Sequence, residues 1–202
     1  MEFVRKFISK LPKKTRILDA GCGEGVLVEE FRLKDYLTEE IDINYKSEYV
    51  HRGNILDMAY SEDSFEVVLL LDVFEHLSFE DQSKALFEIK RILYSQGKLL
   101  ISIPNLAHLN SRFQFYLRGQ LDRTDIEINH PGERSLKENI KILENAGFKI
   151  IRMKGITLTL PFIYRRVICR NPAIFKWLHD ILDVIAFPPI SMLNLFICEN
   201  IK

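Results

Sequence analysis

A short apolar strand followed by a glycine-rich turn constrains this chain more than any other feature. Residues 17–25 read Ile-Leu-Asp-Ala-Gly-Cys-Gly-Glu-Gly, so that Gly21, Gly23 and Gly25 stand at alternate positions. Residues 26–28 are again apolar and begin a helical pattern. A buried strand that ends in such a turn and opens a helix brings bare backbone close to a ligand. The stretch therefore predicts a ligand-binding βα unit near the amino terminus.

Acidic residues accompany this turn. Asp19 lies just before the glycines, and Asp42 lies within Glu40-Ile-Asp-Ile-Asn44. An acid at the end of the second strand of such a unit is well placed to accept both hydroxyls of a ribose. Glu40 is a competing candidate, because alternation along a strand puts it on the same side as Asp42. The spacing from the glycines favours Asp42.

Strand and helix signals alternate along the chain. Strands are expected over residues 15–20, 38–43, 48–53, 65–72, 98–103, 148–153 and 193–198. Helices are expected over residues 25–33, 78–95 and 135–146, the last two opened by cap-like serines and stopped by glycines. Alternating strands and helices with glycine turns predict an α/β fold with a doubly wound, mostly parallel sheet and helices on both faces.

Five segments, in order, resemble the motifs of class I S-adenosylmethionine-dependent methyltransferases, and of the methyltransferase type 11 group in particular. They are Leu18–Gly25, Ile41–Asn44, Arg52–Met58, Ser64–Val68 with Asp72–Leu77, and Gln96–Asn105. The resemblance spans roughly residues 14–155. It implies a Rossmann-like seven-stranded sheet, S-adenosylmethionine as cofactor and S-adenosylhomocysteine as product.

The resemblance also implies a set of cofactor-binding residues. At one of them, this sequence departs from the family's pattern. The set is Asp19, Gly21, Gly23, Gly25, Asp42, Asn54, Ile55 and Asp72. Asn54 stands where the family commonly has an acid, and its amide oxygen would accept from the adenine amino group beside the Ile55 backbone amide. Asp72 would lie near the methionine half of the cofactor. Only nine residues separate Asn44 from Asn54, whereas a parallel crossover normally takes about a dozen or more. We therefore expect the intervening helix to be reduced to a turn.

His76 is the candidate catalytic residue, because it follows the fourth strand, where the resemblance places the reacting methyl group. A neutral imidazole there would take the acceptor's proton. The alternative is that Glu75-His76-Leu77 is helix-entry structure, since methyl transfer is an in-line displacement that positioning alone can accelerate. No metal is expected in the main interpretation. A metal-assisted quinone or RNA-end methyltransferase remains an alternative, with Asp72, Glu75, His76 and His130 as ligands.

Two stretches are expected to form the acceptor side and its lid. Residues 105–134 are a long insert in which Asn105 and His108 would contact the acceptor or order the loop. The connector 156–190 is apolar and aromatic, and it is a core helix, a homodimer surface or a peripheral membrane contact. The whole chain, 1–202, is expected to be a single domain with an N-terminal helix in 1–14 and a cofactor-binding half in 15–104.

Composition limits the remaining classes. The chain is 47% hydrophobic and carries 28 basic and 28 acidic residues, so duplex nucleic acid is not an expected partner. Three dispersed cysteines, Cys22, Cys169 and Cys198, favour a reducing compartment, and a cytoplasmic location is expected. The sequence predicts a methyltransferase acting on an oxygen of a lipid, quinone, sugar or related metabolite. A non-catalytic cofactor-binding partner module is the alternative of another class.

Overall fold

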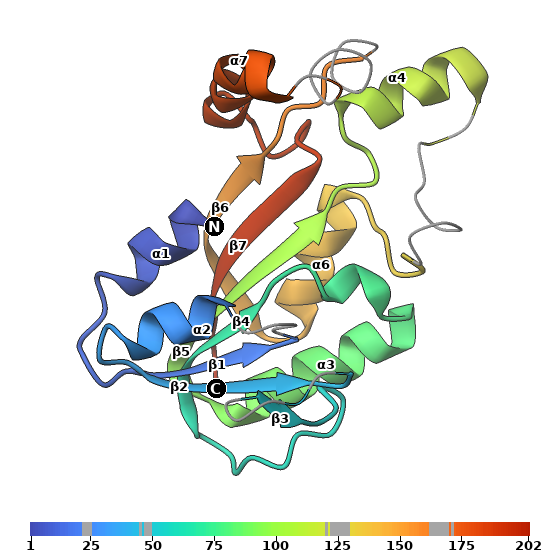
Figure 1. Ribbon diagram of the computed structural model, residues 1–202. Helices are drawn as coiled ribbons and strands as arrows, with labels where there is room; N and C mark the ends of the chain where they lie inside the picture. The colour runs from blue at the N-terminus through green and yellow to red at the C-terminus, as the bar shows by residue number, and fades with distance from the viewer. Residues whose placement is uncertain are drawn as a thin grey trace.

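The protein forms one seven-stranded sheet in the order β3-β2-β1-β4-β5-β7-β6 (Figure 1). The computed structural model describes residues 1–21, 26–44, 46, 50–119, 121, 130–161, 170 and 172–202. The strands are β1 Arg16–Ala20, β2 Leu37–Asp42, β3 Val50–Arg52, β4 Phe65–Leu70, β5 Leu93–Pro104, β6 Phe148–Ile156 and β7 Leu193–Asn200. Strands β1 to β5 pair in parallel, and β7 runs antiparallel between β5 and β6. The mostly parallel, Rossmann-like sheet expected from the sequence is confirmed.

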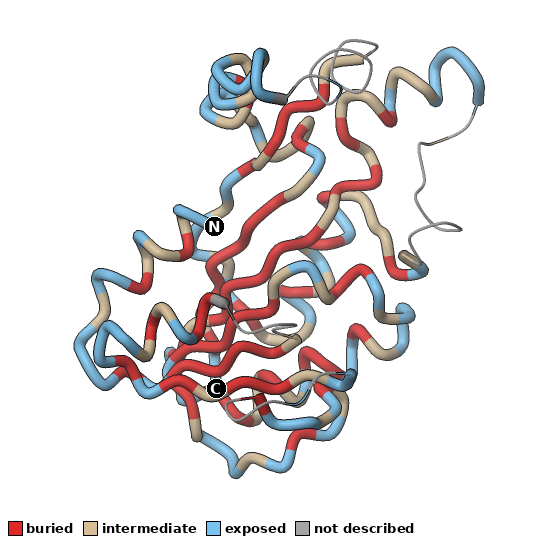
Figure 2. Tube along the Cα trace, viewed as in Figure 1, coloured by how far each residue is buried: buried red, intermediate tan, exposed pale blue. Residues whose placement is uncertain are grey.

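Helices cover both faces of the sheet, as the alternating pattern predicts. They are α1 Glu2–Ile8, α2 Val26–Arg32, α3 Phe79–Ile92, α4 Leu109–Arg118, α6 Leu136–Asn145 and α7 Pro172–Val184. Apolar side chains of α3 and α6 pack on one face of the sheet, and those of α1 and α2 pack on the other. Figure 2 shows the resulting band of buried residues running along the strands. These two layers hold the strand ends in fixed positions.

The junction of α3 and β5 differs from the expectation. The helix ends at Ile92 and the strand begins at Leu93, whereas the sequence pattern extends the helix to Gln96-Gly97 and starts the strand at residue 98. Leu93 pairs with Phe65 of β4, which draws the chain into the sheet early. The Asn200 side-chain amide also donates to three carbonyls at this junction, those of Lys90, Leu93 and Tyr94. A partner more than 100 residues away thus sets this boundary.

The insert 105–134 contains helix α4, which the sequence pattern does not reveal. Only Ser111 of this helix is buried, and Phe115, Tyr116 and Leu117 are consecutive and exposed. Such a run lacks the spacing of a buried apolar stripe. The helix ends at Gly119, whose φ of 69° is left-handed and whose N–H donates to the Phe115 carbonyl.

The crossover between β2 and β3 is short, in line with the expectation from its length. Of its residues, 43, 44 and 46 are described and none is helical, while 45 and 47–49 lie outside the described residues. Strand β3 nevertheless pairs in parallel with β2, with Asp42 opposite Arg52. The ends of these two strands therefore lie side by side.

Two helices lie beyond the carboxyl end of the sheet. Helix α4 follows β5 and α7 follows β6, and both lie at the top of Figure 1. They meet through a small apolar cluster that includes Leu109 of α4 and the buried Leu182 of α7. Among the described residues, every helix is too short or too polar to span a bilayer.

Candidate functional site

The turn after β1 lies directly against the segment that follows β4. Gly21 has a φ of 86°, and its N–H donates to the Ile41 carbonyl over 2.7 Å. A Cβ at this position would overlap the Val73 side chain, so both the backbone angle and the space require glycine. The other two glycines of the motif, Gly23 and Gly25, lie outside the described residues. The turn therefore lies beside the segment that carries Asp72 and His76.

Three acids line the ends of β1 and β2. Asp19 is paired with Glu40 across the two strands, and Asp42 lies two residues further along β2. Asp19 and Glu40 are buried, with exposed fractions of 5% and 2%. Burial raises the pKa of Asp19 to about 7, and the charges of Glu40 and Asp42 add to the effect. The sequence offers Glu40 only as a rival to Asp42 for binding the ribose. In the structure, Glu40 is the neighbour whose charge helps to raise the pKa of Asp19.

The Asp42 carboxylate is oriented by its own turn. Its Oδ1 accepts from the Asn44 N–H over 2.8 Å, and the side chain is only partly exposed. This contact fixes the carboxylate at the carboxyl end of β2, where a ribose would be bound in a fold of this type. Ribose recognition by Asp42 stays a prediction.

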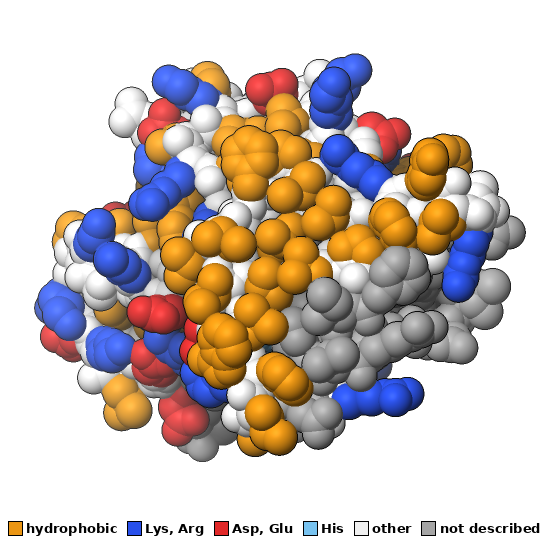
Figure 3. Space-filling view, turned by 90° about the horizontal axis from the view of Figure 1, so that it is seen from above, with side chains coloured by type: hydrophobic (Ala, Val, Ile, Leu, Met, Phe, Trp, Pro, Cys, Tyr) orange, Lys and Arg blue, Asp and Glu red, His pale blue; other side chains and the backbone are white. Residues whose placement is uncertain are grey.

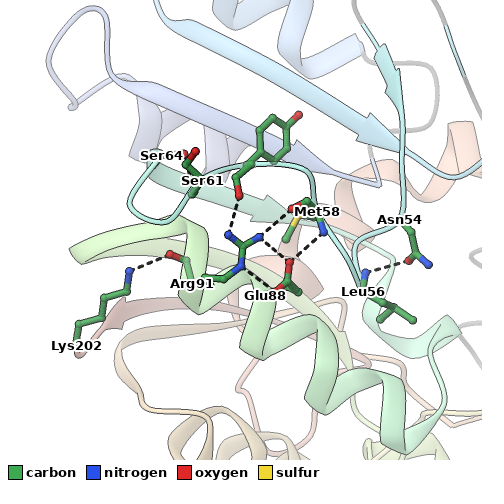
Figure 4. Close-up of polar contacts among 9 residues, drawn as sticks. Asn54, Leu56, Met58, Ser61, Ser64, Glu88, Arg91 and Lys202 are labelled. Carbon is green, nitrogen blue, oxygen red and sulfur yellow. Dashed lines mark hydrogen bonds and ion pairs between the residues drawn. The ribbon is translucent and has the colours of Figure 1, made fainter.

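Asn54 and Ile55 follow β3 and differ in exposure. Ile55 is buried in the core, and Asn54 is exposed. The Asn54 Oδ1 accepts from the Leu56 N–H over 3.0 Å (Figure 4). That oxygen has a second lone pair, so the turn does not prevent it from accepting from an adenine amino group. Adenine recognition at these two residues stays a prediction.

A charged pair on α3 holds the loop that follows Asn54. The Arg91 guanidinium donates to the Tyr60 carbonyl over 2.7 Å and to the Met58 carbonyl over 2.8 Å. Glu88 accepts from the Met58 N–H over 3.0 Å and pairs with Arg91, whose hydrogen bond lowers the pKa of Glu88 (Figure 4). The sequence does not reveal this clamp between α3 and the loop, because Glu88 and Arg91 have the pattern of ordinary charges on the polar side of a helix.

Asp72 is held at the end of β4 by Ser102 of β5. Its N–H donates to the Ser102 Oγ over 2.7 Å, and the Ser102 hydroxyl donates to the Asp72 Oδ1 over 2.8 Å. Asp72 itself is exposed and has a φ of 55°, which is rare outside glycine. Ser102 was also missed; its signal is a single polar residue inside the apolar run 99–103.

Glu75, His76 and His130 converge beyond β4. Each offers one ligand atom, and these atoms lie within 4.8 Å of one another. The two imidazole rings meet edge to face with centroids 4.5 Å apart, and the His130 Nδ1 lies 3.2 Å from a Glu133 carboxylate oxygen. His76 is exposed to solvent, whereas Glu75 is buried. Of the proposed metal ligands, the structure therefore brings three together, including His130 from the insert.

The carboxylate of Glu75 is buried beside these imidazoles. Its Oε2 has no hydrogen-bond partner among the described residues. Burial raises the pKa of Glu75, and the charge of Asp72 adds to the rise. A buried carboxylate oxygen without a partner is costly unless a proton or a cation satisfies it.

Asn105 orders the loops at the carboxyl end of β5. Its buried side chain makes four hydrogen bonds to main-chain groups, those of Ala107, Leu136, Pro189 and Ser191. His108 is also buried, and its Nδ1 lies 2.9 Å from the Thr159 hydroxyl. These contacts are of the loop-ordering kind, one of the two roles expected for the pair. A contact with the acceptor stays a prediction for both.

Comparison with known proteins identifies the family. The model of the methyltransferase domain matches residues 1–153. The chain belongs to this methyltransferase domain family. The structure agrees with that membership, because the matched region contains the turn at Gly21, the acids of β1 and β2, and the segment after β4.

Curated relatives of this methyltransferase domain are longer than the chain itself. An uncharacterized protein of Methanocaldococcus jannaschii is 31% identical over 80% of this chain and 66% of its own length. Probable S-adenosylmethionine-dependent methyltransferases of Mycolicibacterium smegmatis and Mycobacterium tuberculosis are 28% and 29% identical over 69% of this chain. The match spans 54% and 51% of those two proteins.

Solved structures share the fold of this domain. An S-adenosylmethionine-dependent methyltransferase from Archaeoglobus fulgidus matches with a TM-score of 0.65 at 18% identity, covering 98% of this chain and 91% of that one. Phosphoethanolamine N-methyltransferase 2 of Haemonchus contortus, in complex with S-adenosyl-L-methionine, matches with a TM-score of 0.68 at 15% identity. That match covers all of this chain and 52% of the other. At these identities the likeness concerns the fold.

Proposed function

We propose that this protein transfers a methyl group from S-adenosylmethionine to an oxygen of a small acceptor. The observation that carries the proposal is the Gly21 turn, which admits no side chain and lies between the acids of β1 and β2 and the segment after β4. The family membership supports the same activity. The cofactor supplies a methyl group on a positively charged sulfur.

The chain's own residues would divide the work along the strand ends. Asp42 binds the ribose hydroxyls, and Asn54 with the Ile55 amide binds the adenine. Asp72 places negative charge near the cationic methionine half, and Asp19, whose pKa is about 7, contributes a partly protonated carboxyl group at the end of β1. His76, exposed after β4, takes the proton that the acceptor oxygen releases. Positioning of the acceptor in line with the methyl group supplies the main part of the rate enhancement.

A pair of substitutions separates binding from turnover. Asp42→Ala should abolish binding of S-adenosylmethionine and S-adenosylhomocysteine by calorimetry, because it removes the oriented carboxylate at the end of β2. His76→Ala should leave that binding unchanged and lower kcat by about 10² to 10⁴-fold, the usual contribution of a general base. Equal loss of binding and turnover in His76→Ala would exclude the base role. Unchanged binding in Asp42→Ala would exclude the ribose role.

An acceptor of lipid or quinone type is the class we favour. Support comes from the exposed apolar side chains of α4 and α7, which lie at the same end of the sheet as Asp72 and His76. Purified protein and labelled S-adenosylmethionine should be tested with matched sets of lipid, quinone and sugar hydroxyl acceptors. Transfer of label to the sugar set alone would contradict the preference while leaving methyl transfer intact.

A metal-assisted form of the same reaction is the second candidate. It is favoured by the convergence of Glu75, His76 and His130 and by the unpartnered buried oxygen of Glu75. Two imidazoles and one carboxylate suit a divalent transition metal, and a metal-bound acceptor hydroxyl would lose its proton more easily. Neither the family description nor the names of the relatives mentions a metal.

Cobalt titration tests this second candidate without any acceptor. Co²⁺ bound by these three side chains should give visible absorption bands at one equivalent, and Glu75→Gln or His130→Ala should weaken binding at least about tenfold. His51→Ala, which changes an exposed histidine on β3, is the matched control and should bind as the parent does. No saturable absorption in the parent protein would eliminate the metal-assisted form.

A further inference from the structure

Helix α7 presents a row of apolar side chains to solvent. Ile174, Trp177, Ile181 and Val184 recur at helical spacing, and their exposed fractions lie between 48% and 81%. Lys176 and Asp180, which form an ion pair, occupy a different side of the same helix. An amphipathic helix normally turns its apolar face inward. This helix keeps a large part of that face outside.

The outward row is not an unpacked core, because α7 already has its own contacts with the protein. Leu182 is buried, and with Phe175 and Leu178 it joins the apolar cluster that reaches Leu109 of α4. The Thr157 N–H and hydroxyl both hold the Asp183 carboxylate, over 2.9 and 3.0 Å, which ties the helix to the end of β6. Helix α7 therefore packs against the protein with one apolar side and exposes the other to solvent.

The apolar surface extends beyond this helix. Around the two helices at the carboxyl end of the sheet, further exposed side chains are Phe115, Tyr116, Leu117, Ile185 and Phe187. Figure 3 looks onto this end of the molecule and shows hydrophobic side chains gathered over its middle. Contiguous apolar surface of this kind marks an interaction site in a folded protein. We call these residues, with the four of the α7 row, the apolar cap.

The charges near the apolar cap are mainly positive. Among the described residues of 105–121 and 170–192, the charged groups are Arg112, Arg118, Arg170 and Lys176 against Asp180 and Asp183. Lys176 and Asp180 pair with each other, which leaves three arginines against Asp183, whose carboxylate accepts hydrogen bonds from Thr157. Figure 3 shows Lys and Arg side chains at several places around the apolar region, with Asp and Glu side chains also at its edges.

We propose that the apolar cap docks on the surface of an anionic lipid bilayer, with α7 lying in the interface. A tryptophan and branched apolar residues in a row, with cations around them, suit the boundary between headgroups and acyl chains. A bilayer satisfies the apolar and the basic groups together, whereas a second copy would bring the same cations face to face. The apolar cap lies beyond the carboxyl ends of β5 and β6, so docking would bring this end of the sheet, with the candidate site, towards membrane-borne acceptors. That last consequence rests on the proposed function, and docking itself does not.

Trp177 is the only tryptophan of the chain, so its fluorescence reports on the apolar cap directly. The protein, without cofactor, is titrated with phosphatidylglycerol vesicles and with phosphatidylcholine vesicles. With the anionic vesicles we expect a blue shift of the emission and quenching by brominated acyl chains, weakened by salt. Phosphatidylcholine should give at least tenfold weaker binding. No shift with anionic vesicles would overturn the proposal.

Two variants keep Trp177 and test its surroundings. The double change Ile174→Asp and Ile181→Asp should lower vesicle binding about a hundredfold or more, since each apolar residue buried is worth about tenfold or more. Phe87→Asp, at an exposed phenylalanine of α3 outside the apolar cap, should bind as the parent does. Circular dichroism and calorimetry with S-adenosylhomocysteine check that both variants fold and bind cofactor. Equal binding by the double variant and the parent would overturn docking through α7.

Measurements without lipid test whether a second copy of the protein, rather than a bilayer, covers the apolar cap. A blue shift that grows with protein concentration in the absence of lipid, with a dimer in sedimentation, would assign the apolar cap to a second copy and overturn the proposal. Monomeric protein with a constant spectrum supports it. Failure of methyl transfer alone would leave vesicle binding unchanged, so the two proposals fail separately.

Discussion

At the scale of single residues, Asp19 shows how neighbouring strands change the chemistry of a side chain. Its pKa rises from 3.8 to about 7 on folding, mainly through burial. The folded state therefore holds the proton more tightly than the unfolded state does. The stabilisation from this proton is complete below pH 3.8 and is lost as the pH rises to about 7.

Asp19→Asn should consequently stabilise the protein against urea at alkaline pH. The advantage should grow between about pH 4 and 7 and level off at roughly 4 kcal/mol, because each pKa unit corresponds to about 1.4 kcal/mol. Asp57→Asn, at an exposed acid after β3, is the control for the Asp-to-Asn change itself. An advantage that is the same at every pH would show that the titration of Asp19 is not its source.

The sequence predicts some of these residues well, and the physical reason is local. Gly21 and Asp42 occupy the strand ends that the sequence pattern assigns to them, because strand, turn and helix are encoded within a few neighbouring residues. Ser102 and Arg91 were missed, since each acts on groups about 30 residues away in the chain. Such pairings depend on the order of the strands, which a single segment does not contain.

At the scale of elements, the Glu88–Arg91 pair of α3 couples a helix to the loop after Asn54. Arg91→Met should lower the free energy of unfolding by about 2 kcal/mol, since hydrogen bonds to charged groups are worth about 1.5–3 kcal/mol. Binding of S-adenosylhomocysteine should weaken with it, because the released loop adjoins Asn54 and Ile55. Chemical denaturation and calorimetry measure the two effects.

Lys84→Met is the matched control on the same helix. Lys84 pairs with Glu80 and Asp81 of the same helix at the surface. Exposed ion pairs contribute little, so this variant should keep both stability and cofactor binding. An equal effect of the two substitutions would show that the loop clamp is not the cause.

Helices α3 and α4 mark where prediction from the sequence works and where it stops. Helix α3 has a capping serine and a buried apolar stripe, and both were recognised. Helix α4 buries little, and its apolar run Phe115–Leu117 faces solvent, so its pattern carries no periodic signal. A helix whose apolar side chains face solvent cannot be predicted from the spacing of core residues, because those side chains do not belong to the core.

At the scale of the whole molecule, the sheet brings together groups that are far apart in the chain. The glycine turn and the acids come from the first 42 residues, His76 follows β4, and His130 belongs to the insert. The fold class and the cofactor side of this arrangement follow from the alternating pattern. The convergence of His130 on Glu75 does not, because it depends on how the insert returns to α6.

The position of β7 has a consequence for the time course of biosynthesis. This strand is the last of the seven to be made, yet it lies between β5 and β6 and supplies the Asn200 amide that holds the α3–β5 junction. On the ribosome, β6 leaves the exit tunnel without a neighbour to pair with. Because β6 pairs only with β7, its addition to the sheet has to follow the synthesis of β7.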